Sequence, residues 1–289
     1  MSQFGFIGLG MMGHPMAHLL YGAGHTLVVR DANAAVAQGF VQDHPGTVAA
    51  ANAADFAGCD AVITMLPNSD IVDTVVKEMA GSLRRGACII EMSSADPTRT
   101  RALAVHLAGM DIGLIDAPVS GGVKKAQAGT LAIMVGGERA LFEAQKPLLE
   151  VMGKAITYVG PVGAGHALKA LNNYVSAAAL IATAEAIHVG AAFGIDRAVI
   201  VDVINASTGK NNTSDNKAHQ YMLNGAFNSG FSLALQAKDV GIAASLGEAV
   251  DHPMALARKV SDMTDEASRT LGAKADHTEL YSYVGKKAG

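Results

Sequence analysis

The chain has 289 residues, of which 50% are apolar and 17% are charged, and its formal net charge is -4. A chain of this length usually exceeds one hydrophobic core, so we expect two globular domains and, given the apolar content, no extended disorder. The mildly acidic balance, without a basic tail or stripe, argues against a nucleic-acid partner.

The first predicted strand, Phe4–Ile7, leads into a turn that is typical of dinucleotide binding. The six residues after it are Gly8, Leu9, Gly10, Met11, Met12 and Gly13, which give the pattern G-x-G-x-x-G between a strand and a helix. Gly8 permits the tight turn, Gly10 lets the backbone approach a pyrophosphate, and Gly13 allows close helix packing. The phosphates then meet the positive helix end. No cleavable apolar leader precedes the strand, which favours a cytoplasmic protein.

The second predicted strand, Thr26–Arg30, ends next to Asp31. This is where a dinucleotide site places the acid that accepts hydrogen bonds from the adenine ribose hydroxyls and repels a 2′-phosphate, so Asp31 favours NAD over NADP. Arg30 can pair with such a phosphate, but strand alternation points it away from Asp31. The alternative is that Asp31 merely caps a turn, a role that Asn33 can also fill.

Two residue pairs raise the question of a metal or a disulfide. His14 and His18 lie four apart on the first helix, which suits a metal, but no third ligand is evident. Cys59 and Cys88 lie in apolar contexts without a CxxC or His-rich pattern. We therefore predict no metal site and two reduced core thiols.

Further strands are predicted at Ala61–Met65, Cys88–Glu91, Gly113–Asp116 and Leu131–Val135, with helix-like segments between them. This alternation predicts a Rossmann-type, doubly wound parallel sheet with helices on both faces over residues 1–163. Ligands of such sheets bind at the carboxyl ends of the strands, so Leu66, Pro67 and Ser94 are expected walls of the cofactor site. Ordinary turn chemistry explains Pro67 equally well.

From residue 164 to 289, Ala-rich segments with helical periodicity predict an all-α domain. Its first helix, His166–Phe193, should be about 40 Å long and form the spine of this domain. Lys169, Asn173 and Glu185 interrupt the apolar run, so we predict a buried helix and no membrane span. Later helices are predicted at Arg197–Asn205, Asn216–Leu223, Leu233–Leu246 and Met254–Leu271.

Three further motifs reveal a resemblance that covers nearly the whole chain. Residues 116–122 read Asp-Ala-Pro-Val-Ser-Gly-Gly, residues 160–173 follow G-x-x-G-x-G-x-x-x-K-x-x-x-N, and residues 238–241 read Lys-Asp-Val-Gly. With the glycine turn, they make the chain resemble the 3-hydroxyisobutyrate dehydrogenase family of β-hydroxyacid dehydrogenases, which includes tartronate semialdehyde reductases. The resemblance implies a nicotinamide-dependent enzyme for a small hydroxy acid that forms a homo-dimer or homo-tetramer. Leu19 and Ser245 depart from the usual asparagine and aspartate.

The resemblance also assigns roles that physical chemistry supports. Ser120, Gly121 and Gly122 offer a hydroxyl and unhindered N–H groups to a substrate carboxylate, although a plain glycine turn is the alternative. Lys169 is the expected general acid/base, because apolar surroundings lower the pKa of a lysine toward neutrality. Asn173, one helical turn later, is expected to orient the substrate oxygen or Lys169. Lys238, held by Asp239, is expected to pair with the substrate carboxylate or to close the cleft, and a surface salt bridge is the alternative.

Two other functions share this architecture: an NADPH-dependent semialdehyde or imine reductase, and a non-catalytic nucleotide-sensing protein. Asp31 argues against NADPH, and Lys169 with Asn173 argues against both an imine reductase and a sensor. The polar run Ser207–Thr213 is expected either to contact the far end of the substrate or to be a solvent loop.

Overall fold

The computed structural model describes residues 3–272 and 274–287. The chain forms two compact units, Met1–Lys169 and Ala170–Gly289. The first unit ends at Lys169 rather than at residue 163, because the opening turn of the long helix is hydrogen-bonded to a strand of the sheet through Asp116.

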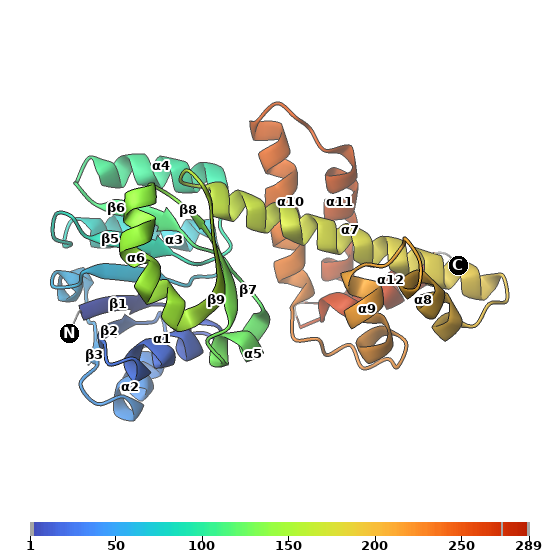
Figure 1. Ribbon diagram of the computed structural model, residues 1–289, viewed down its shortest axis with the longest axis horizontal. Coiled ribbons are helices and arrows are strands. Elements are labelled where there is room, and N and C mark those ends of the chain that lie inside the picture. The colour runs from blue at the N-terminus through green and yellow to red at the C-terminus, as the bar shows by residue number, and fades with distance from the viewer. Residues whose placement is uncertain (1–2, 273, 288–289) are drawn as a thin grey trace. The chain divides into compact units, whose positions relative to one another are not determined.

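The first unit is built on a nine-stranded sheet (Figure 1) with the order β3-β2-β1-β4-β5-β6-β8-β7, and β9 pairs with β8. The strands are β1 (Gln3–Ile7), β2 (Thr26–Arg30), β3 (Val48–Ala49), β4 (Ala61–Thr64), β5 (Cys88–Glu91), β6 (Gly113–Asp116), β7 (Val119–Ser120), β8 (Leu131–Gly136) and β9 (Gly153–Gly160). From β3 to β6 all neighbours are parallel.

The far edge of the sheet differs from the predicted all-parallel arrangement. Strand β8 runs antiparallel to β6 and β7, and parallel to β9. The reason is the short link between β6 and β8, whose helix α5 (Gly122–Gln127) has six residues, too few for a parallel crossover. Strand β9 was not predicted, although it contains the strand-forming residues 156–159, Ile-Thr-Tyr-Val, and most of its side chains are exposed or half-buried.

Helices cover both faces of the sheet, as the alternating pattern predicts. One face packs against α1 (Gly13–Gly22), α2 (Ala34–Asp43), α5 and α6 (Arg139–Met152), and the other against the 3₁₀ helix η1 (Ala53–Phe56), α3 (Ser69–Ala80) and α4 (Pro97–Ala108). Cys59 and Cys88 are free thiols inside these two cores, as expected. Burial raises their pKa values to about 11 and about 12.

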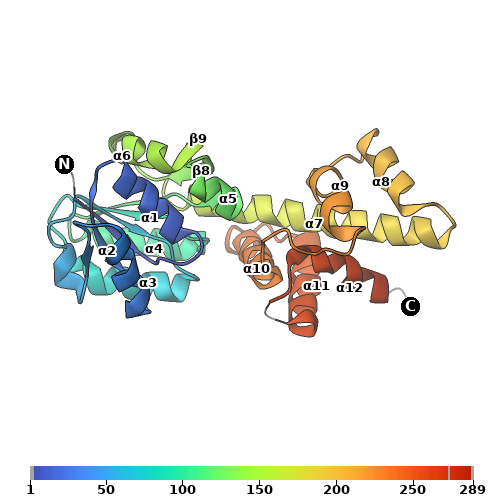
Figure 2. The same ribbon diagram turned by 90° about the horizontal axis from the view of Figure 1, so that it is seen from below.

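The second unit is helical (Figure 2). Its helices are α7 (Ala164–Ala192, which begins in the first unit), α8 (Arg197–Asn205), α9 (Asn212–Asn216), the π-helix η2 (Ala218–Met222), α10 (Leu233–Ala249), α11 (Ala255–Leu271), the 3₁₀ helix η3 (His277–Glu279) and α12 (Leu280–Lys287). The single helix predicted at Asn216–Leu223 is wrong. Asn211 caps α9 through Thr213 and Ser214, so helix starts earlier and then changes to a π turn.

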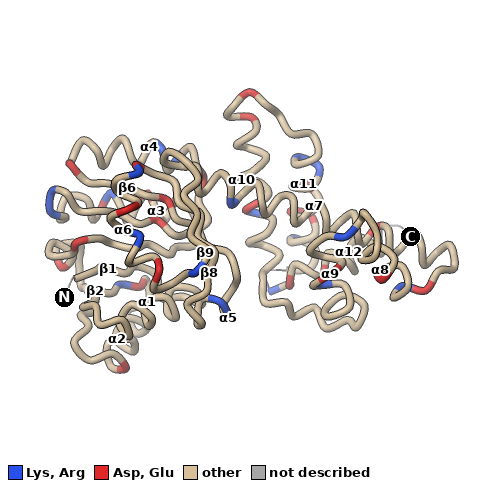
Figure 3. The backbone as a smooth tube through the Cα atoms, viewed as in Figure 1, with Lys and Arg blue, Asp and Glu red and all other residues tan. Residues whose placement is uncertain are grey.

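Helix α7 is less buried than its apolar sequence predicts. Val175 and Val189 are 61% and 69% exposed, and Phe193, directly after the helix, is 86% exposed. By length and composition alone the helix could cross a membrane, and 33% of its apolar window is buried. Figure 3 shows that most of its length carries no charged residue. The expectation of a buried helix therefore holds for only one side of α7.

Candidate active site

The glycine turn between β1 and α1 has the geometry of a phosphate cradle. Gly8 has a φ of 97°, and a Cβ there would lie 2.2 Å from the Met65 carbonyl oxygen. A Cβ on Gly13 would lie 1.8 Å from the Gly8 carbonyl oxygen, so α1 packs directly on the turn. A Cβ on Gly10 would meet nothing within 4 Å. The backbone at Gly10 is thus open to a ligand at the start of α1. Met11 beside it is 74% exposed.

Asp31 at the end of β2 supports this turn directly. Its carboxylate accepts hydrogen bonds from Leu9 N at 2.8 Å and from Asn33 N at 2.9 Å. Each oxygen keeps a lone pair for a further donor such as a ribose hydroxyl. Asn33, and not Asp31, caps α2 by accepting from Ala35 N. Arg30 is drawn to Glu78, 3.0 Å away, so the arrangement fits NAD.

The loops after β4 and β5 are tied together at the same end of the sheet. Leu66 N donates to Ser93 Oγ at 2.8 Å, and Asp96 N donates to Ser69 Oγ at 2.8 Å. Leu66 and Ser94 are half-buried and Pro67 is exposed. The three residues predicted as cofactor walls therefore lie on two hydrogen-bonded loops at the carboxyl ends of neighbouring strands.

The Ser-Gly-Gly segment forms the bend between β7 and α5. Gly121 and Gly122 have φ angles of 137° and 67° and are exposed, while Ser120 is half-buried. A Cβ on Gly121 would lie 2.5 Å from Lys125 Cδ, whereas one on Gly122 would meet nothing within 4 Å. Two consecutive glycines with positive φ carry no side chain that would cover their N–H groups, so these donors are open to an anionic ligand.

A buried charge network that the sequence analysis missed holds the start of α7. Asp116 accepts from Gly163 N at 2.7 Å and from His166 N at 2.8 Å. His166 Nε2 lies 2.7 Å from Glu91 Oε2, and its Nδ1 lies 2.9 Å from Thr100 Oγ1. These side chains are almost inaccessible to solvent. The sequence signal that could have revealed this network is the acidic residue at the end of each of two apolar strands, Glu91 in β5 and Asp116 in β6.

Burial and charge act in opposite directions on this network. Burial alone would raise the pKa of Glu91, but the charge and hydrogen bonds of His166 and Ser93 lower it. Burial alone would lower the pKa of His166, but the carboxylates of Glu91 and Asp116 raise it. Both net shifts favour the ion pair of Glu91 and His166.

Lys169 follows this first turn of α7. It is half-buried, whereas a buried side chain was expected. Its two neighbours lie on different sides of the helix, since Leu168 is 43% exposed and Ala170 is 3% exposed. Lys169 is one helical turn before Asn173, so the two side chains share a face of α7.

Asn173 is held within the helical unit by a buried carboxylate. Its Nδ2 donates to Asp239 Oδ2 at 2.6 Å, and Asp239 Oδ1 lies 3.4 Å from Lys238 Nζ. The side chain of Asp239 is 3% exposed and that of Lys238 is 26% exposed, so the pair is not a surface salt bridge. Asn173 was expected to orient the substrate or Lys169. The structure gives it Asp239 as an acceptor and Asn172 Nδ2 as a donor, 3.2 Å from its Oδ1.

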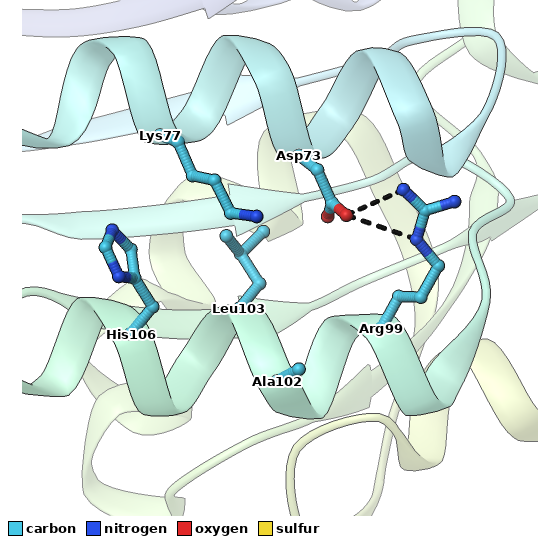
Figure 4. A pocket seen from close by; sticks show the side chains of 6 residues that line it. All are labelled: Asp73, Lys77, Arg99, Ala102, Leu103 and His106. Atoms are coloured by element: carbon cyan, nitrogen blue, oxygen red, sulfur yellow. Dashed lines mark hydrogen bonds and ion pairs between the residues drawn. The ribbon is translucent and has the colours of Figure 1, made fainter.

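Other polar groupings in the described residues do not form a metal site. No group of three or more His, Cys, Asp or Glu side chains there is arranged for a metal. His18 instead contacts His44 at 2.8 Å. A hollow of about 190 Å³ lies between α3 and α4 (Figure 4), where Arg99 is bound to Asp73. None of the predicted site residues lines that hollow.

Comparison with known proteins also divides the chain into two parts, with the boundary between residues 160 and 163. Residues 3–160 match the family described as the NAD binding domain of 6-phosphogluconate dehydrogenase. Residues 163–284 match the family described as NAD-binding of NADP-dependent 3-hydroxyisobutyrate dehydrogenase.

Whole-chain relatives are dehydrogenases of hydroxy acids. The 2-(hydroxymethyl)glutarate dehydrogenase of Eubacterium barkeri is 38% identical over 93% of this chain and 90% of its own length. The NAD-dependent L-serine dehydrogenase of Pseudomonas aeruginosa is 38% identical over 86% of each chain. The structure of Mycobacterium tuberculosis 3-hydroxyisobutyrate dehydrogenase with L-serine has a TM-score of 0.92 and 32% identity, and the match covers 98% of this chain and 99% of that one. The chain therefore belongs to the 3-hydroxyisobutyrate dehydrogenase family and is an NAD-dependent oxidoreductase that acts on a CH–OH group.

Proposed function

We propose that this enzyme interconverts a small β-hydroxy acid and its semialdehyde, with Lys169 as the general acid and base. The observation that carries the proposal is the pair of Lys169 and Asn173 on one face of α7, where Asn173 is fixed by the buried Asp239. A lysine that contributes only to solubility would not require an oriented amide such as Asn173 on the same face of the helix.

Bound NAD would supply a hydride acceptor, and reduced NAD a hydride donor. In the oxidation direction, Lys169 Nζ accepts the hydroxyl proton while the carbon–oxygen single bond becomes a double bond. In the reduction direction, Lys169 Nζ returns that proton to the oxygen. The same amine donates a hydrogen bond to the developing oxyanion. Asn173 positions the substrate oxygen without placing another charge in the site.

The substrate carboxylate is assigned to two further sets of groups. Ser120 offers its hydroxyl, and Gly121 and Gly122 offer backbone N–H groups in a positive-φ bend. Lys238 offers an ammonium that Asp239 restrains. The relatives act on substrates that differ beyond the hydroxyl and first carboxylate, since one name describes a glutarate and another L-serine.

A spectrophotometric panel tests the proposal. Reduced nicotinamide is followed with NAD or NADP and 3-hydroxyisobutyrate, glycerate, L-serine, threonate or 2-(hydroxymethyl)glutarate. Turnover of at least one acid with NAD is expected. Flat traces across the panel would favour a nucleotide sensor, and turnover with NADP alone would favour the NADPH-dependent alternative.

Lys169→Ala should lower kcat by about 100- to 10,000-fold, the usual contribution of a general acid or base, and leave NAD affinity nearly unchanged. Lys169→Arg is the matched control, because arginine keeps the charge but cannot release a proton. Calorimetric titration with NAD measures binding. Equal loss of binding and turnover in the alanine variant would contradict the assignment.

We also infer a homo-dimer or homo-tetramer and a cytoplasmic location. The oligomer is supported by the exposed apolar side chains of α7, α8 and the turn between them, among them Phe193 and Val203. Cell fractionation tests the location.

A further inference from the structure

Lys217 is a partly buried lysine that the proposed chemistry does not use. It lies between α9 and the π-helix η2, and its carbonyl oxygen accepts from Met222 N at 3.3 Å, which closes a π turn. Such turns are rare and are frequent at functional sites. The segment just before it is the polar run expected either to contact the far end of the substrate or to be a solvent loop. Of that run, residues 207–210 are exposed and Thr213 is buried.

The Lys217 side chain lies against the polar stripe of α7. Its Nζ donates to Ser176 Oγ at 3.4 Å, and Asn211 Nδ2 from the same segment donates to Thr183 Oγ1 at 3.1 Å. Ser176 is one turn after Asn173, and seven residues after Lys169, so these side chains share one face of the helix. The polar side chains on this face of α7 therefore continue beyond Lys169 and Asn173 to Ser176, where the Lys217 amine lies.

The charge on Lys217 is only partly balanced. Burial lowers its pKa, and Asp276 opposes that shift. Among the described carboxylates none forms an ion pair with Lys217, and Ser176 is its hydrogen-bond partner. The Asp276 carboxylate is already occupied by Ser229, Gly230 and Thr278. His277 stays neutral, because burial and the nearby Lys217 lower its pKa to about 4.

We propose that Lys217 binds a second carboxylate of the substrate, so that the enzyme prefers hydroxy acids with two carboxylates over those with one. This rests on the proposed function of Lys169 and Asn173. A desolvated ammonium with no anion of its own gains most from a ligand anion. The Lys217 ammonium lies at Ser176, about 10 Å of helix rise beyond Lys169. A substrate that contacts both amines must therefore carry its second carboxylate at the end of an extended chain.

The first experiment compares 2-(hydroxymethyl)glutarate with 3-hydroxyisobutyrate in the wild type and Lys217→Met. The wild type should have the higher kcat/KM for the dicarboxylate. Loss of one charge-assisted hydrogen bond should lower the dicarboxylate value by about 10- to 100-fold in the variant, mainly through KM. The value for 3-hydroxyisobutyrate should change by less than about twofold, since its single carboxylate does not reach this amine.

Lys210→Met is the matched control, because Lys210 lies on the same segment but is 52% exposed and pairs with Asp215. It should leave both substrates unchanged. If Lys217→Met lowers both substrates equally, or lowers the melting temperature enough to explain the loss, Lys217 is structural and the proposal is overturned. A wild type that prefers the monocarboxylate overturns it as well.

A binding measurement separates this proposal from the proposed function. Glutarate and butyrate, which carry no hydroxyl, are titrated calorimetrically into wild type and Lys217→Met in the presence of NAD. Stronger binding of glutarate that disappears in the variant supports the subsite even if no hydroxy acid is turned over. Equal binding of the two acids, or glutarate binding that survives the substitution, would sink it.

Discussion

The imidazole of His166 has an acceptor at each nitrogen. Thr100 Oγ1 donates its own proton to the Asp96 carbonyl oxygen at 2.9 Å, so it accepts from His166 Nδ1. The other nitrogen faces Glu91 at 2.7 Å. The nearby carboxylates of Glu91 and Asp116 raise the pKa of His166, which favours the protonated ring.

Glu91→Gln should lower the free energy of unfolding by about 3 kcal/mol, because it leaves a buried cation without its partner. Glu91 contributes above its ordinary pKa of 4.5, and its contribution is lost as the pH falls through its lowered folded pKa. His166 contributes below its ordinary pKa of 6.5, and its contribution is lost as the pH rises through its raised folded pKa. The loss should thus be largest between pH 4.5 and 6.5.

Urea unfolding of wild type and variant across this pH range measures the effect. The double variant Glu91→Gln with His166→Gln removes both charges and should recover part of the stability. A loss that does not vary with pH would show that the pair is not ionic.

At Asp31, the expected result concerns cofactor choice. Asp31→Ser should shift the ratio of kcat/KM for NAD and NADP by about tenfold or more toward NADP, because the repulsion of a 2′-phosphate is removed. Arg30→Met is the control and should leave the ratio unchanged, since Arg30 is paired with Glu78. Steady-state rates with each cofactor decide the matter. A large shift in the Arg30 variant would mean that Arg30, and not Asp31, reads the ribose.

At the scale of a helix, the start of α7 depends on an acid from another element. Asp116 in β6 takes the place of an N-cap by accepting from Gly163 N and His166 N. In Asp116→Asn the amide NH₂ would face one of these donors, and a buried N–H would stay unsatisfied. We expect a loss of about 2 kcal/mol.

Thermal unfolding and hydrogen exchange at the first turn of α7 check this expectation. Asp196→Asn is the control, because Asp196 caps α8 in the same way at an exposed position and should cost only a few tenths of a kcal/mol. Similar losses in the two variants would show that burial of the Asp116 cap contributes little.

Elements with a strong local signal could be predicted from the sequence. Strands β2, β5 and β6 and helix α8 have the predicted bounds, because apolar runs end there at turn residues or caps. The π turn after α9 and helix α12 were missed, since tertiary packing decides both. In the candidate site, motifs located Asp31, Lys169 and Asn173, but their partners did not follow. The bond from Asn173 to Asp239 and the pair of Glu91 with His166 join residues that lie 66 and 75 positions apart, a separation that periodicity does not report.

For the molecule as a whole, the exposed apolar surface of α7 and α8 bears on the assembly of the chain into an oligomer. Val189 on α7 and Phe193 just after it lie four residues apart, and Val199 and Val203 lie four apart on α8, all at least 50% exposed. Between these helices is an apolar hollow lined by Ala186, Ile195, Val199, Ile200, Val203 and Ile204. Exposed apolar surface of this kind is typical of subunit interfaces, which supports the proposed homo-dimer or homo-tetramer.

The double variant Phe193→Glu with Val203→Glu should therefore be a monomer at concentrations where the wild type is a dimer or tetramer. Light scattering coupled to size-exclusion chromatography measures the mass. Val105→Glu on α4 is the control, because Val105 is 75% exposed but outside this surface. A monomeric wild type, or an unchanged mass in the double variant, would rule out an interface on this surface.

The two buried thiols can report the rate at which the core around them opens. The side chains of Cys59 and Cys88 are essentially closed to solvent, and burial raises their pKa values to about 11 and about 12. An alkylating reagent needs a thiolate that it can reach, so neither sulfur should react before the sheet opens. The rate at which iodoacetamide labels each cysteine then reports how often the surrounding core is breached, at Cys59 and at Cys88 separately, without any denaturant.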